Sequence, residues 1–166
     1  MGRIYNIVAA NATMVTAVNV LAGIYPVATP PAAGSVLAIN RVEITQGANA
    51  TSAQCRISLA ARTGGNLTVA TVTPSAAMYG GTASAIAGVA GTLAAGKCGI
   101  TGSADATPTY VSLVEAAFNA LNGWLWIPTP AERIYLTGAV AFVVRFLADP
   151  GTLTGWNCTV NFEEIY

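Results

Sequence analysis

Apolar and polar side chains alternate along much of the chain with a period of two residues. The clearest run is Gln54 to Arg62, in which Cys55, Ile57, Leu59 and Ala61 share one face while Arg56, Ser58, Ala60 and Arg62 share the other. Because successive side chains of a strand point to opposite faces, this run predicts a half-buried antiparallel strand. The same pattern over 140–147 and 156–163 predicts two more strands, and the turn residues of 148–151 predict a hairpin or a corner between two sheets.

Further strands are expected over 3–9, 14–24, 36–46 and 66–73. In the third of these the apolar positions change face, which predicts a β-bulge near Asn40. Residues 110–121 suit either a strand or a short helix, and the surrounding strands favour a strand. Thr129, Pro130 and Glu132 form a capping-box pattern that predicts a single helical turn.

About eight short strands, turn-rich connections and one helical turn indicate an all-β fold, an antiparallel β-sandwich resembling a jelly roll. The 166 residues suit one domain, 1–166. Residues 74–107 are rich in Ala and Gly and predict a loop or weakly stranded excursion. The uncharged stretch 76–96 is long enough to cross a bilayer, but it is so poor in Leu, Ile, Val and Phe that we expect no membrane span.

The charged residues and the absence of histidine restrict the possible functions. No histidine is present, which excludes Ser-His-Asp and Cys-His nucleophilic sites and His metal ligands. The seven acidic residues are not clustered, so we expect no catalytic site, no metal site and no cofactor. Charged residues are only 8% of the chain, against about 25% in an ordinary domain. The seven basic residues form no patch, which argues against nucleic acid as a partner, and the net charge of zero favours self-association.

Cys55, Cys98 and Cys158 are far apart and odd in number, which predicts buried, reduced thiols rather than a disulfide framework. The opening residues lack the apolar stretch of a secretory signal, so we expect folding in the cytosol. This expectation agrees with reduced cysteines.

Several residues are candidates for contacts with a partner. Trp124 and Trp126 share one face of a short strand, and Leu125 and Ile127 share the other. The two tryptophans could stack on sugars or anchor an interface, although packing on the core is the commoner role of large aromatic residues. Glu163 and Glu164 are expected to point to opposite faces of a strand at a sheet edge. The full set of candidate interface contacts is Arg3, Tyr5, Trp124, Trp126, Arg133, Glu163, Glu164 and Tyr166.

Four segments carry a resemblance to a known group of proteins. They are the opening residues 1–5, the strand Arg41-Val42-Glu43-Ile44-Thr45-Gln46, residues 117–119 with 123–133, and the last strand ending Phe162-Glu163-Glu164-Ile165. Together they resemble small virion structural proteins of tailed phages, in particular auxiliary capsid proteins that decorate or cement the head. Residues 76–107 depart from this pattern.

The resemblance implies a β-rich, non-enzymatic protein that binds the major capsid protein across capsomer junctions. It further implies a homo-oligomer, with a trimer favoured, on the exterior of the capsid after assembly in the host cytoplasm. Two alternatives stay open: a single jelly-roll subunit that forms the shell itself, and a carbohydrate-binding or adhesive module on the virion that uses Trp124 and Trp126. A hydrolase is disfavoured by the missing histidine and unpaired acids.

Overall fold

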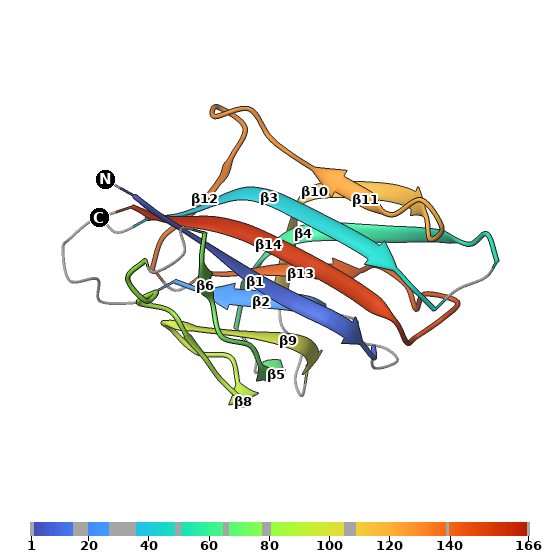
Figure 1. Ribbon diagram of the computed structural model, residues 1–166, viewed down its shortest axis with the longest axis horizontal. Coiled ribbons are helices and arrows are strands. Elements are labelled where there is room, and N and C mark those ends of the chain that lie inside the picture. Colours follow the sequence, from blue (N-terminus) through green and yellow to red (C-terminus); the bar gives the residue numbers. More distant parts are fainter. Residues whose placement is uncertain are drawn as a thin grey trace.

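The computed structural model describes residues 2–14, 20–26, 36–48, 51–64, 67–77, 81–104, 109–138 and 140–165, and within them every regular element is a strand (Figure 1). One sheet has six strands in the order β11-β3-β14-β1-β6, with β12 also pairing with β3. Its strands are β1 (Arg3–Ala12), β3 (Val36–Gln46), β6 (Ser75–Ala76), β11 (Trp124–Trp126), β12 (Ile134–Leu136) and β14 (Trp156–Ile165).

The second sheet has eight strands in the order β10-β4-β13-β2-β9-β5-β8, with β7 also pairing with β9. Its strands are β2 (Val20–Tyr25), β4 (Gln54–Thr63), β5 (Leu67–Thr71), β7 (Ala87–Gly88), β8 (Gly91–Thr92), β9 (Lys97–Ala104), β10 (Thr109–Asn119) and β13 (Ala141–Phe146). The short contact between β7 and β9 is parallel, whereas the long strands pair antiparallel.

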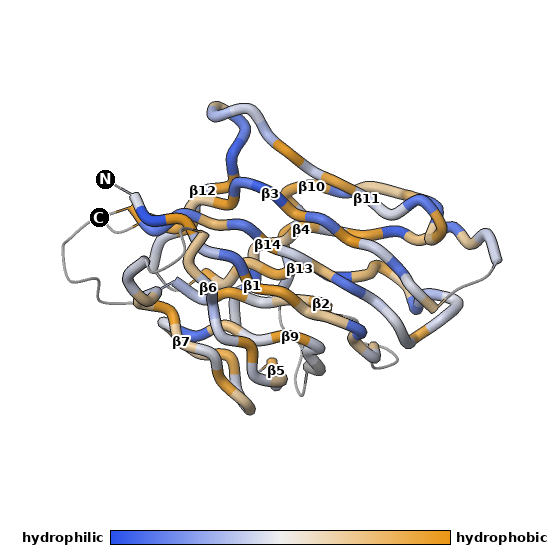
Figure 2. The backbone as a smooth tube through the Cα atoms, in the orientation of Figure 1, coloured by the Kyte–Doolittle hydropathy of each residue, from blue (hydrophilic) through white to orange (hydrophobic). Residues whose placement is uncertain are grey.

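The two sheets pack face to face around one main core. Alternate residues of β14 (Trp156, Cys158, Val160 and Phe162) point into it, and the residues between them are only partly buried. The same alternation of hydrophobic and hydrophilic positions is visible along the strands in Figure 2. The predicted β-sandwich is therefore confirmed, while the finer expectation of jelly-roll connectivity stays a prediction. In the described part of the chain no helix is long and apolar enough to cross a bilayer.

Several local predictions are confirmed by the strand register. Asn161 pairs with Arg41 and Phe162 with Ile39, so Asn40 is the extra residue of a bulge. Residues 109–119 form a strand and not a helix. The connection after β13 is the predicted corner and not a hairpin, because β13 and β14 belong to different sheets. The expected strand 14–24 is seen as β2, and its residues 15–19 lie outside the described residues.

The expected helical turn at 129–132 is wrong. The backbone forms a single hydrogen-bonded turn, in which the Glu132 amide donates to the Thr129 carbonyl oxygen at 2.9 Å. The capping contact itself is present, since the Thr129 amide donates to Glu132 Oε2 at 3.1 Å. The turn cannot continue into a helix because Ile134, two residues later, already pairs with Ile39 of β3.

The strand Gln54–Thr63 is also more buried than expected. Its outward residues Ser58, Ala60 and Arg62 are buried, and Ala60 belongs to a second, smaller core on the outer face of the eight-stranded sheet. Leu67 and Val69 of β5, the neighbour of β9 in this sheet, belong to this core together with Leu93. The close approach of Val69 needs glycine on β9, because a Cβ at Gly99 would lie 2.2 Å from Val69 Cγ2. In the described part of 74–107, β6, β7 and β8 are two residues long, whereas β9 is an eight-residue strand inside the sheet, and Ile86, Leu93 and Cys98 are buried.

Candidate functional site

Two of the candidate contact residues lie at the end of β1. Arg3 is exposed and pairs in register with Glu164. Tyr5 is only 1% exposed, and its ring centroid lies 5.7 Å from that of Phe162. Its hydroxyl donates to the Thr82 carbonyl oxygen at 3.1 Å. Tyr5 therefore belongs to the core and holds a distant segment of the chain, and it is not part of an exposed contact surface.

Glu164 is likewise buried, with 5% of its surface exposed. Its carboxylate accepts hydrogen bonds from the Ser84 hydroxyl, from the Ala85 amide at 3.2 Å and from the Ile86 amide at 3.4 Å. Because Ser84 to Ile86 lie about half the chain away in sequence, this carboxylate fixes the same segment that Tyr5 contacts. We call residues 82–86 the strap.

Glu163 points to the opposite face of β14, as predicted, and forms an ion pair with Arg133 at 3.5 Å. The expectation that both glutamates lie at a sheet edge is wrong, because β14 lies between β3 and β1. The structure therefore brings Arg133 and Glu163 together and separates them from Glu164. Tyr166 lies outside the described residues.

Trp124 and Trp126 pair with Ile44 and Val42 of β3, and both pack half-buried against the main core. Leu125 and Ile127, on the opposite face, are 54% and 66% exposed. The prediction that the tryptophans share one face is confirmed, and that face is the inner one. The pair therefore does not form an open platform on which a sugar ring could stack.

Large apolar side chains are exposed mainly on one side of the sandwich. Eight such residues are exposed in the described ranges, and Ile4 and Val8 on β1 are two of them. The other six come from a single stretch of the chain; they are Val111, Leu113, Leu121, Leu125, Ile127 and Tyr135. We call these six residues the apolar edge. They lie on or beside β10, the last strand of the eight-stranded sheet, and β11 and β12, which border the six-stranded sheet on the same side (Figure 1).

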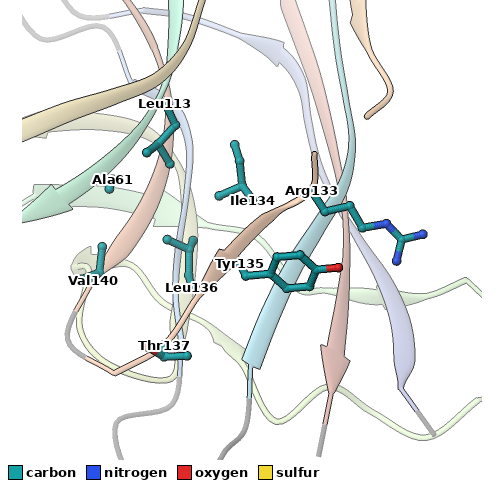
Figure 3. Close-up of a pocket in the computed structure, with 8 residues that line it drawn as sticks. All are labelled: Ala61, Leu113, Arg133, Ile134, Tyr135, Leu136, Thr137 and Val140. Carbon is teal, nitrogen blue, oxygen red and sulfur yellow. The ribbon is translucent and has the colours of Figure 1, made fainter. Parts of the chain in front are cut away.

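A groove of about 450 Å³ opens within the apolar edge, between β10 and β12. Its apolar lining is Ala61, Leu113, Ile134, Leu136 and Val140. In Figure 3, Leu113 and Val140 face the side chains of Ile134 and Leu136, whereas Tyr135 and Arg133 point away from them. The groove lies beside β12, which is only three residues long.

The polar groups of this region are held by intramolecular contacts. Glu115 lies 3.9 Å from Arg56, and Glu132 accepts from the Thr129 hydroxyl at 2.8 Å. Bonds from the Thr129 hydroxyl and amide lower the pKa of the Glu132 carboxyl below its ordinary value. Among the described residues, no three Cys, Asp or Glu side chains come together in a way that could hold a metal ion.

The cysteines are free and buried, as predicted. Burial raises the pKa of Cys98 and of Cys158 to about 12, which keeps both as neutral thiols. A thiol in this state is a poor nucleophile, so these residues serve as small apolar parts of the core.

Comparison with protein-family models, with curated proteins and with solved structures found no match. The candidate site is therefore identified from the structure without a related protein. It is the apolar edge with its groove, and in the described ranges it contains no group of reactive side chains. Sequence reasoning identified the stretch around Trp124 and Trp126 and gave core packing as the commoner role of the tryptophans, but it did not select Leu125 and Ile127 as contact residues. The available signal was that Leu125 and Ile127 alternate with the tryptophans, so that one pair had to point outward.

Proposed function

We propose that the chain is a non-enzymatic structural protein of a phage virion, which decorates and cements the head by binding across capsomer junctions. The observation that carries the proposal is the apolar edge. Six large apolar side chains exposed on or beside β10, β11 and β12 favour contact with another molecule, because exposed apolar surface of this kind often marks an interaction site. The four sequence segments that resemble auxiliary capsid proteins supply the identity of the assembly.

The charge distribution supports a role in assembly. The chain has seven basic and seven acidic residues, and Glu115, Glu132 and Glu163 are held by Arg56, Thr129 and Arg133. Such a surface offers shape and apolar contact to a partner and little net electrostatic attraction. We propose the major capsid protein as the partner, together with further copies of this chain, with a trimer favoured. Many weak contacts repeated over a shell then add up to stable attachment.

The test compares virions that carry the protein with virions assembled without it. Each preparation is heated in steps at low salt, and released DNA is measured with a dye that cannot enter intact heads. We expect particles without the protein to release DNA at lower temperature, because subunit contacts across the capsomer junctions are missing. Adding purified protein back to the deficient particles should restore the release temperature. Equal release temperatures with and without the protein would refute the proposal.

A further inference from the structure

We infer that a second copy of this chain covers the apolar edge. The edge strand β10 is eleven residues long, and in the described part of the chain it pairs only with β4. It contains a single charged residue, Glu115, and neither lysine nor proline, which are the residues that usually protect an edge strand from pairing. A long, nearly uncharged edge of this kind is suited to contact with another protein chain.

The loop 127–133 supplies a protrusion for such a contact. It stands out from the body of the sandwich between β11 and β12 (Figure 1) and begins with Ile127. Bonds between Thr129 and Glu132 hold its shape, and the Tyr135 hydroxyl donates to the Pro130 carbonyl oxygen at 3.2 Å. A loop that is already ordered loses little conformational entropy on binding. The exposed side chain of Ile127 is therefore already positioned for contact before a partner binds.

The groove supplies the matching recess. Its volume of about 450 Å³ falls within the range of about 300–1,000 Å³ that is typical of small-ligand pockets. Leu113, Ile134 and Leu136 give it an apolar wall that suits a branched aliphatic side chain. Because protrusion and groove lie on the same side of one chain, each copy in a closed assembly can give Ile127 to a neighbour and receive one in return.

The charges and the exposed area favour a second copy over a charged partner. Glu115, Glu132 and Arg133 each have an intramolecular partner, so these three side chains do not select an oppositely charged partner. The net charge of zero leaves no overall repulsion between copies. Six side chains exposed by about half amount to roughly 600 Å², the lower end of the about 600–1,000 Å² per partner of a standard interface.

The experiment measures the mass of the purified full chain by sedimentation velocity, from about 1 to about 100 µM and with a reductant present. We expect a species of at least twice the 16.8 kDa of the chain. Ile127→Asp and Leu113→Asp should each raise the dissociation constant about tenfold or more, because a carboxylate would be buried in the contact. Val8→Asp is the matched control: Val8 is 46% exposed on β1, away from the edge, and its substitution should leave assembly unchanged.

Circular dichroism shows whether each variant is folded, and hydrogen exchange provides a second measurement that needs no variant. The amides of β10 should exchange more slowly at high protein concentration than at low concentration. A monomer throughout the concentration range would overturn the inference. So would an Ile127→Asp variant that assembles like the wild type, or an assembly in which β10 gains no protection. These results are independent of the virion role, since a monomer could still cement heads and an assembly could form without a capsid.

Discussion

Replacing Glu164 tests whether its buried carboxylate is what holds the strap on the sandwich. Glu164→Ala removes the acceptor of three donors: the Ser84 hydroxyl and the amides of Ala85 and Ile86. Glu164→Gln keeps the size and one acceptor oxygen but removes the charge. Glu163→Ala is the matched control, because Glu163 is the same residue type one position earlier and points to the opposite face.

The expected loss follows from the number and burial of these bonds. A hydrogen bond to a charged group contributes about 1.5–3 kcal/mol, and the 3.4 Å contact with Ile86 is too long to count fully, so Glu164→Ala should cost about 2–4 kcal/mol. For a chain of this length that corresponds to a fall in Tm of about 4–16 °C. Glu164→Gln should lie between the wild type and Glu164→Ala. Glu163→Ala removes one partly exposed ion pair and should cost about 0–1 kcal/mol.

Thermal unfolding followed by circular dichroism measures all three variants. A double-mutant cycle of Glu164→Ala with Ser84→Ala then isolates the contact with the strap, and we expect a coupling free energy of about 0.5–3 kcal/mol. If Glu164→Ala were no more destabilising than Glu163→Ala, or if the coupling were zero, the carboxylate would not hold the strap and the reasoning would be refuted.

Three other predictions concern the second core, the thiols and the projecting loop. Gly99→Ala should destabilise the fold by about 1–3 kcal/mol in chemical denaturation, because the new methyl group would overlap Val69, whereas Gly151→Ala, with open space around it, should change stability by less than about 0.5 kcal/mol. Cys98 and Cys158, whose pKa values burial raises to about 12, should resist a thiol reagent at pH 8 until denaturant is added; rapid labelling of the native protein would contradict their burial. Because hydrogen bonds from Thr129 lower the pKa of Glu132, their contribution to loop stability should be complete above the ordinary value of 4.5 and should decline as the pH falls through the lowered pKa. Thr129→Val should move the pKa of Glu132 in an NMR titration back towards 4.5, and an unchanged pKa would show that the Thr129 hydroxyl does not set it.

Local patterns in the sequence were sufficient to predict most of the strands. The alternation of apolar and polar residues predicted the strand Val36–Gln46 with both of its end points. The change of face within this strand predicted the bulge at Asn40. These features depend on neighbouring residues, which a sequence shows directly. The sequence left open whether β13 and β14 form a hairpin or belong to different sheets, because a turn sequence alone does not specify which sheet the next strand joins.

Contacts between distant segments account for what the sequence did not predict. Tyr5 and Glu164 are polar residues near the ends of the chain, and the strap at residues 82–86 supplies hydrogen-bond partners for both of them. In the same way, Ala60 is buried in a second core that it shares with Leu67 and Leu93, which lie far from it along the sheet or the chain. Alternation divides a strand into two faces without saying what will cover each face. The candidate contact residues could therefore be placed on faces, and their exposure could not be deduced.

The strand Trp124–Trp126 shows how this limit bears on function. Pairing with β3 turns the two tryptophans inward and so exposes Leu125 and Ile127 to water. Covering the apolar edges of two copies, about 600 Å² each at about 25 cal/mol per Å², would release about 30 kcal/mol before the costs of association are subtracted. Those costs are about 4–15 kcal/mol for lost translational and rotational freedom, with a further cost for ordering side chains, so the covered edges are sufficient to hold two copies together.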